Sequence, residues 1–406
     1  MQISQRLVWI FSNSYIARNT SLFSKKPKFF KYQFAIFIFG LMRIIHFFLL
    51  QIVEVKQKTV IEDHILIKSS APHMHLNYFR VMNKEISTTN LLYIDCYDKK
   101  NFTQVIQLNF LDLYKEFLIT FKEIKPVLSN LTAEDGKNNL LYEALTSLPV
   151  FTYFVCLFKA LKKINPDIKV YSGGAHTVSA SAIEAGIETT WFCHGLIDQA
   201  FSLNRENIKP NPALYSITYP NYDSIYLYSL DEKEYLSNHG ISSKLILYPY
   251  EQIDALKNKI LIFLNDEDHN MNLTNLLELI DFFERNKYEI VIKLHPSYQG
   301  KLTTRFKDSD NIRLSDNRAP SAYELMVDEK PKFVAGWLST TQCEAYRQGI
   351  VPICLSSEKE AMYVPYRFQE KSIWWEKDKE LLNELLKNDS NIFKNFLDNK
   401  SAENNK

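Results

Sequence analysis

The sequence lacks several features that would assign it to a common class. Its 48 lysines and arginines balance 47 aspartates and glutamates, so it has no basic excess for tracking nucleic-acid phosphates. The five cysteines are an odd number without paired metal-ligand spacing, which favours buried thiols in a reducing compartment. No internal repeat stands out, and no secretory signal peptide is evident in the short first apolar run. The charge balance argues against nucleic acid as the main partner, and disulfide bonds remain the alternative for the cysteines.

The 406 residues, 46% of them hydrophobic, are enough for two domains with substantial cores. Short apolar runs alternate with helical patterns, which predicts an α/β fold with parallel sheets. The expected strands are Leu91–Cys96, Ile168–Tyr171, Thr190–Cys193, Ser224–Tyr228, Leu245–Tyr248, Ile260–Leu264, Glu289–Leu294, Lys332–Ala335 and Val351–Leu355. The expected helices are Leu111–Phe121, Leu140–Lys163, Val178–Gly186, Leu273–Arg285, Thr341–Gln348 and Glu380–Lys387, and the tail after Phe396 is expected to fray.

The pattern breaks around Tyr248–Asn258, which is the best domain boundary. We therefore expect two Rossmann-like parallel-sheet domains that face a cleft, at residues 59–250 and 251–406.

Residues 1–58 form a separate basic and apolar segment, with nine lysines or arginines and one acid. Its apolar run Phe34–Val53 is long enough to span a bilayer, but Arg43 and His46 lie near its centre and disfavour spanning. Two interpretations remain open. The run is either a helix lying on an anionic membrane surface, or a core helix of the N-terminal domain. The first predicts a cytoplasmic protein at the inner face of the cytoplasmic membrane.

The most informative motif is the apolar run Glu289–Pro296, which ends in His295-Pro296. It is typical of a buried parallel strand whose carboxyl end presents an imidazole, with Lys293 just before it. Ligands of open α/β sheets bind beyond the carboxyl ends of the strands. We therefore expect Lys293, His295 and Pro296 to bind a nucleotide phosphate, although a His-Pro pair also commonly ends a strand in a purely structural turn.

A second motif follows the next predicted strand, where Ser339, Thr340 and Thr341 form a hydroxyl-rich turn before a helix. Hydroxyls and unpaired N–H groups at a helix N-terminus hold phosphate, although Ser-Thr-Thr is also a common helix cap. Glu344 falls about one turn further on, within reach of ribose hydroxyls, and Gly349 fits the end of the helix. Together with His295, this order and spacing predict a nucleotide-sugar site.

In the N-terminal half, two further turns follow predicted strands. One contains Gly173-Gly174, which permits close backbone approach, and the other contains His194-Gly195 with Asp198 nearby. Such turns should line the same edge of the sheet, where His194 could bind or deprotonate an acceptor hydroxyl. The alternative is a hydrogen-bonded histidine that closes a strand.

With these motifs the sequence resembles the bacterial sialyltransferase-like glycosyltransferases of GT-B fold, over residues 255–360. The resemblance implies that His295-Pro296 contacts the phosphate and nucleoside of a CMP-activated sugar, and that Ser339-Thr340 binds the phosphate. It also implies metal-independent chemistry without a cofactor, and a catalytic base in an acidic motif. Asp266 and Asp268 occupy the position of that motif after the strand Ile260–Leu264, although the glycine of the family motif is absent.

The resemblance therefore predicts an inverting glycosyltransferase that moves sialic acid or a related nonulosonate onto a lipooligosaccharide or capsule. Its expected partners are the nucleotide-sugar donor and a surface-glycan acceptor. The base is either the acidic loop, with Asp268 ahead of Asp266, or His194. Rival predictions are another donor (CMP-Kdo, a UDP-sugar or CDP-glycerol) and a catalytically silent GT-B scaffold. No metal ligands are expected, and the loose group of His64, His73 and His75 has no accompanying cysteine or dense carboxylate group.

Overall fold

A computed structural model of the chain divides into two compact units. The first comprises residues 1–194, 209–226 and 236–246, and the second comprises residues 195–208, 227–235 and 247–406. The residues that the structure describes are 64–68, 91–95, 108, 110–130, 137–173, 176–193, 222–238, 241–265, 272–295, 298, 300–302, 306, 311–315, 320–337, 339–356, 371–387 and 391–404.

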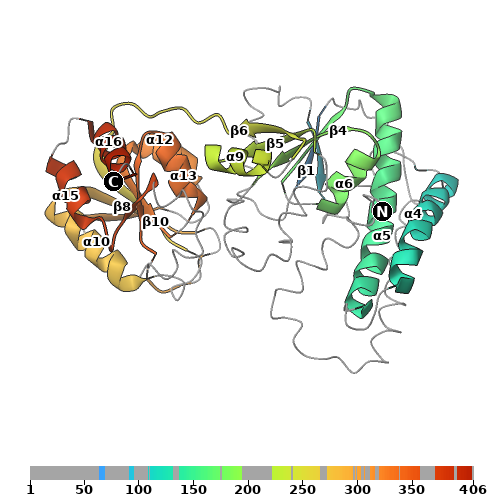
Figure 1. Ribbon diagram of the computed structural model, residues 1–406, viewed down its shortest axis with the longest axis horizontal. Helices are drawn as coiled ribbons and strands as arrows, with labels where there is room; N and C mark the ends of the chain where they lie inside the picture. Colours follow the sequence, from blue (N-terminus) through green and yellow to red (C-terminus); the bar gives the residue numbers. More distant parts are fainter. Residues whose placement is uncertain are drawn as a thin grey trace. The chain divides into compact units, whose positions relative to one another are not determined.

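The first unit is built on a six-stranded sheet of order β2-β1-β3-β4-β5-β6 (Figure 1). Its strands are β1 (His64–Lys68), β2 (Leu91–Asp95), β3 (Lys169–Ser172), β4 (Glu188–Phe192), β5 (Ser224–Leu227) and β6 (Lys244–Leu247). β1 pairs in parallel with both β2 and β3, and β4 pairs in parallel with β3 and β5. The chain therefore runs outward in both directions from the pair β1 and β3, as in a doubly wound sheet.

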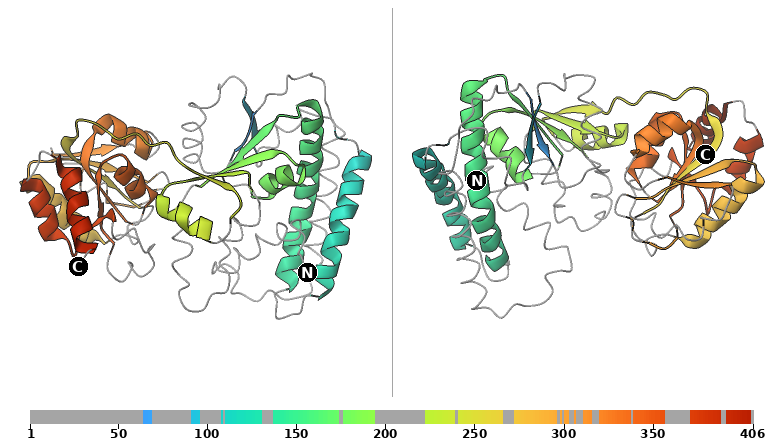
Figure 2. Two further views of the ribbon diagram at one scale, coloured as in Figure 1. Left: turned by 45° about the horizontal axis from the view of Figure 1, so that its top comes forward. Right: turned by 180° about the vertical axis from the view of Figure 1, so that it is seen from behind.

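The helices in this part of the chain are α4 (Phe110–Asn130), α5 (Lys137–Ile164), α6 (His176–Glu184) and α9 (Leu230–Asn238), and most of α9 belongs to the second unit. α4 and α5 run side by side, as both views of Figure 2 show, and Lys159 of α5 pairs with Glu116 of α4 at 2.7 Å. Their buried side chains join those of β1, β3 and α6 in one apolar cluster that includes Ile67, Leu113 and Phe158. Burial of this cluster removes apolar area from water and fixes α5 and α6 on the sheet.

The second unit contains a six-stranded sheet of order β12-β11-β10-β7-β8-β9, in which all pairings are parallel. The strands are β7 (Lys257–Phe263), β8 (Glu289–Lys293), β9 (Ile312–Ser315), β10 (Pro331–Gly336), β11 (Val351–Cys354) and β12 (Ile373–Trp374). The helices are α10 (Leu273–Arg285), α12 (Ala322–Glu329), α13 (Thr340–Arg347), α15 (Lys379–Lys387) and α16 (Ile392–Asn404).

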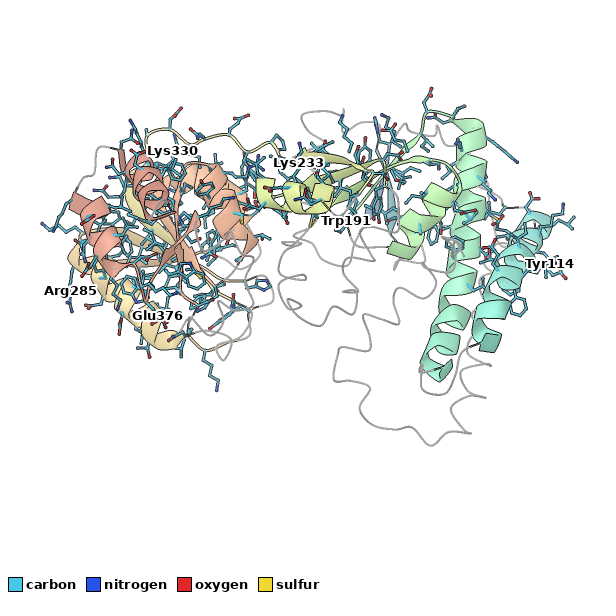
Figure 3. All side chains as sticks on the ribbon, in the orientation of Figure 1. Tyr114, Trp191, Lys233, Arg285, Lys330 and Glu376 are labelled. Carbon is cyan, nitrogen blue, oxygen red and sulfur yellow. The ribbon has the colours of Figure 1, made fainter. Side chains whose placement is uncertain are left out.

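Side chains alternate between the two faces of this sheet, because successive residues of a strand point in opposite directions. Ile260 and Ile262 of β7 belong to the cluster formed with α10, α15 and α16, whereas Leu261 and Phe263 belong to the cluster formed with α12 and α13. Helices therefore cover both faces (Figure 1, and Figure 3 with side chains), which explains why the central strands are almost continuously apolar. The predicted α/β fold with two Rossmann-like parallel sheets is confirmed; the predicted cleft stays a prediction.

The structure corrects several details of the predicted elements. Among the described elements, three short strands (β1, β9 and β12) and three helices (α9, α12 and α16) were not predicted. The prediction of a frayed tail after Phe396 is wrong, because α16 continues to Asn404 and Phe396 is fully buried against the sheet. Burial of this face supplies the tertiary stabilisation that a short helix needs.

Among the helices that the structure describes, none combines the length and apolar character needed to cross a membrane. The run Phe34–Val53, for which the sequence analysis left two interpretations open, lies outside the described residues.

Candidate nucleotide site at the switch point of the second sheet

The strand order of the second sheet identifies where a ligand is expected. From β7 the chain proceeds through β8 and β9 on one side, and through β10, β11 and β12 on the other. The order reverses between β7 and β10, and ligands of doubly wound sheets bind at such a switch point, beyond the carboxyl ends of the strands. The segments that leave these two ends are the loop after Phe263, which leads to the predicted acidic residues, and the hydroxyl turn after Gly336.

At the switch point the ends of β7 and β10 approach each other closely. A Cβ atom on Gly336 would lie 3.3 Å from the carbonyl oxygen of Phe263, closer than most such contacts. Because the atom it meets belongs to the backbone, a larger residue would push the two strand ends apart. Glycine at this position therefore keeps the starting points of the two loops side by side.

The hydroxyl turn begins α13 with a capping box. Ser339 is the N-cap residue, its side chain accepts from the N–H of Thr341, and the side-chain oxygen of Gln342 accepts from the N–H of Ser339. The hydroxyl oxygen of Thr341 is buried and has no hydrogen-bond partner among the described residues. The positive end of the helix, with the hydroxyls of Ser339, Thr340 and Thr341, can hold an anionic phosphate. That these residues do so stays a prediction.

Gln342 fixes this turn to the sheet. Its amide nitrogen donates to the carbonyl of Gly336 at 3.0 Å and to the carbonyl of Ile353 at 2.7 Å, and its oxygen accepts from Ser339. The side chain is fully buried and links β10, β11 and the N-terminus of α13. All of its hydrogen-bonding groups are used, so the hydroxyl turn is held without a ligand.

Replacing Gln342 with leucine should lower the free energy of unfolding by roughly 2–4 kcal/mol, because the carbonyls of Gly336 and Ile353 and the N–H of Ser339 each lose a hydrogen bond. The carbonyl of Gly336 keeps its other bond, from the N–H of Leu355. Denaturant titration measures the loss. Glu380→Leu on the exposed start of α15 is the matched control and should change the stability by less than about 0.5 kcal/mol. Wild-type stability in Gln342→Leu would show that these bonds do not anchor the turn.

The predicted phosphate residues of β8 lie at the same edge of the sheet. Lys293 is the last residue of the strand and is 5% exposed, while His295 follows two residues later and is exposed. The carbonyl oxygen of His295 accepts from the N–H of Tyr298 at 2.9 Å, which shows that the chain turns sharply after the strand. Since β8 neighbours β7, the structure brings the ends of β7, β8 and β10 to one edge.

Glu344 lies on the second turn of α13 and is 5% exposed. Its Oε1 atom accepts a hydrogen bond from the hydroxyl of Tyr250 at 2.8 Å, and the guanidinium of Arg347 lies 4.8 Å from the centre of the Tyr250 ring. Neither contacting residue was predicted from the sequence. Arg347 is three positions after Glu344 and could have been found by helical spacing, whereas no local signal indicates Tyr250.

α13 ends at Arg347, one residue before the predicted end. Gln348 is its C-cap residue, and Gly349 follows with φ +79°, the left-handed conformation that ends many helices and that glycine adopts without strain. β11 then begins at Val351 and contains Pro352.

The remaining predicted site residues are only partly described. Gly173 is buried directly after β3, at the switch point of the first sheet beside β1. The acidic loop, the acceptor-side turn and the proline of the phosphate motif lie outside the described residues; they comprise Asp266, Asp268, Gly174, His194, Gly195, Asp198 and Pro296.

Within the described part of the chain, no group of three or more His, Cys, Asp or Glu side chains is arranged to hold a metal ion. His64, one of three histidines considered in the sequence, is the first residue of β1, and its Nδ1 atom lies 3.4 Å from the hydroxyl of Tyr171. His73 and His75 lie outside the described residues, so metal independence stays a prediction.

No protein-family model matches the chain, and no curated protein matches it in sequence. Among solved structures, Arabidopsis thaliana UGT89C1 complexed with UDP-L-rhamnose is 8% identical, with 84% of this chain and 94% of that chain covered and a TM-score of 0.46. UDP-GlcNAc 2-epimerase from Methanocaldococcus jannaschii is 14% identical, with 84% and 99% covered and a TM-score of 0.43. The glycosyltransferase VinC in complex with DTDP is 13% identical, with 84% and 94% covered and a TM-score of 0.41. At these values the fold assignment rests on the two sheets of this chain.

Proposed function

We propose that the protein is an inverting, metal-independent glycosyltransferase that uses a nucleotide-activated sugar. The base takes the proton of an acceptor hydroxyl, and the acceptor oxygen forms a bond to the anomeric carbon. The bond from that carbon to the phosphate oxygen breaks, and the nucleotide leaves with the electron pair. His295 and the N-terminus of α13 stabilise the charge that develops on the departing phosphate.

One observation carries this proposal: the strand order of the second sheet reverses between β7 and β10, and the hydroxyl turn Ser339–Thr341 leaves the end of β10. Doubly wound sheets bind nucleotides at this point. The helix N-terminus suits a phosphate, and Glu344 one turn later suits a ribose. Neither feature requires a metal ion to neutralise the phosphate.

For the donor we propose a CMP-activated nonulosonate such as sialic acid, because His295-Pro296 and Ser339-Thr340 resemble the motifs of bacterial sialyltransferase-like enzymes. The acceptor would then be a surface glycan, lipooligosaccharide or capsule. We also propose that the basic residues 1–58 bind the protein to the inner face of the cytoplasmic membrane. The alternative donors are CMP-Kdo, a UDP-sugar and CDP-glycerol.

Binding of nucleoside monophosphates to the full-length protein tests this proposal. Calorimetric titration with CMP, UMP and the unphosphorylated nucleosides, in the presence of EDTA, should show binding of CMP and weaker binding of cytidine. Tight binding of UMP in place of CMP would transfer the proposal to a UDP-sugar donor. If no nucleotide binds, the proposal of a glycosyltransferase is contradicted and a catalytically silent scaffold is favoured.

A matched variant, Thr340→Val, keeps the size of the side chain and removes its hydroxyl. The variant should weaken the binding of CMP by about fivefold to tenfold and leave the affinity for cytidine unchanged, because the lost hydrogen bond is made to the phosphate. An equal loss for both ligands would mean that the turn does not hold the phosphate.

A further inference from the structure

We propose that Tyr250 is a positioning residue for the ribose of the nucleotide, because its hydroxyl fixes the orientation of the Glu344 carboxylate. The inference rests on the proposed function. It adds to the proposed nucleotide site a residue that belongs neither to the strand ends nor to α13. Tyr250 lies in the segment between β6 and β7.

The contact joins two groups whose geometry is restricted. The carboxylate of Glu344 is buried, and a buried charge is stable only when hydrogen bonds replace its lost hydration. The hydroxyl of Tyr250 donates one such bond at 2.8 Å, across 94 residues of sequence. A hydrogen bond to an ionised acceptor is among the stronger ones in proteins, so this contact limits the rotation of the carboxylate.

The ring of Tyr250 is itself held on several sides. The guanidinium of Arg347 lies over it at 4.8 Å, and the rings of Tyr323 and Tyr248 lie at 5.8 and 6.1 Å. Arg347 is fixed in turn, because it donates to the carbonyl oxygen of Tyr228 at 3.2 Å. The hydroxyl therefore reaches Glu344 from a ring that these neighbours restrain.

The main chain near Tyr250 is tied to the same helix. The N–H of Ile253 donates to the carbonyl oxygen of Gln348, the C-cap residue of α13, at 2.9 Å. Ile253 also packs against the apolar cluster that includes Ala345 of α13. These contacts hold the segment that follows β6 against α13. They therefore keep Tyr250 within hydrogen-bonding distance of Glu344.

Glu344 is placed correctly for a ribose. Thr340 and Thr341 precede it by four and three residues, so the three side chains share one face of α13. Along the helix axis Glu344 is about 6 Å beyond Thr340. A nucleotide whose phosphate lies at the N-terminus of α13 would extend its sugar in this direction, and an ionised carboxylate accepts hydrogen bonds from ribose hydroxyls.

The charge of Arg347 also favours the contact between Tyr250 and Glu344. Burial is the largest influence on Arg347 and lowers its pKa, while Tyr250, Cys343, Glu232 and Glu344 act in the opposite direction. The guanidinium nevertheless remains protonated at neutral pH, because its ordinary pKa is far higher. Arg347 therefore contributes a positive charge beside the carboxylate and a flat surface for the Tyr250 ring.

The test compares wild type with Tyr250→Phe, which removes the hydroxyl and keeps the ring. Affinities for CMP and 2′-deoxy-CMP are measured by calorimetry, with UMP and 2′-deoxy-UMP in their place if uridine nucleotides bind. We expect wild type to prefer the ribonucleotide by about tenfold, and Tyr250→Phe to reduce this preference roughly fivefold while the deoxynucleotide binds as before. If Tyr250 had a purely structural role, the variant would bind both nucleotides more weakly by the same factor, which would contradict the inference.

Two further variants control the result. Tyr323→Phe changes a tyrosine that touches the same ring and should retain the wild-type preference. Glu344→Gln should reduce the preference as Tyr250→Phe does, and combining the two should add little, because both act on one carboxylate.

The possible failures are distinguishable. If wild type binds the nucleotides and Tyr250→Phe, folded by its melting curve, keeps the ribose preference, Tyr250 has no positioning role and the proposed function stands. The inference also fails if wild type does not distinguish ribose from deoxyribose. If wild type binds no nucleotide at all, the proposed function and this inference fail together.

Discussion

Replacing His295 with alanine should lower turnover about a hundredfold or more and leave the fold intact. His295 follows the end of β8, at the edge of the sheet where β7 and β10 also end. Loss of a group that stabilises the leaving phosphate raises the barrier of the chemical step. The side chain is exposed, so its removal creates no cavity in the core.

The assay measures kcat and KM for sugar transfer, with melting curves to verify folding. His295→Asn retains a hydrogen-bond donor and should be less impaired than His295→Ala. A folded His295→Ala variant with nearly normal turnover would remove His295 from the mechanism.

Changing Asp268 to Asn should keep nucleotide affinity and lower kcat steeply, by about a hundredfold or more, if the acidic loop provides the general base. The loop follows β7 at the switch point of the second sheet, and the Asn side chain keeps the size of Asp while losing its basicity. His194→Ala should chiefly raise KM for the acceptor, as expected for a binding contact.

Steady-state kinetics with saturating donor separate these effects, and Asp266→Asn tests the neighbouring acid. The opposite pattern would assign the base to His194. In that case Asp268→Asn would be nearly fully active, and His194→Ala would be inactive but would still bind CMP. A base must lie within hydrogen-bond reach of the hydroxyl that it deprotonates. Loss of the base should therefore lower kcat, whereas loss of a group that only binds the acceptor should raise KM.

The second sheet was largely predictable from the sequence, because its central strands are long apolar runs covered on both faces. β7, β8, β10 and β11 lie within a few residues of the predicted bounds, and α10 was predicted with its observed ends. The missed strands carry little local signal. β12 has two residues, and β9 mixes apolar and polar residues. Such strands are defined by their neighbours in the sheet.

The candidate site divides in the same way. The hydroxyl turn could be predicted because an N-cap, the helix after it and the glycine at its end are signals within about ten residues of one another. The contact between Tyr250 and Glu344 could not, since it depends on how the segment after β6 folds over α13. Gln342 was also missed, because its hydrogen bonds to Gly336 and Ile353 appear only once β10 and β11 are paired.

The bonds of Gln342 have a consequence for the thermodynamics of nucleotide binding. A loop that becomes ordered only when its ligand arrives loses conformational entropy, and this loss weakens the affinity. Here the turn is already anchored to two strands by a buried side chain, so a phosphate would meet N–H and O–H groups that have lost most of their freedom during folding. Association at this turn would therefore show a small entropic penalty.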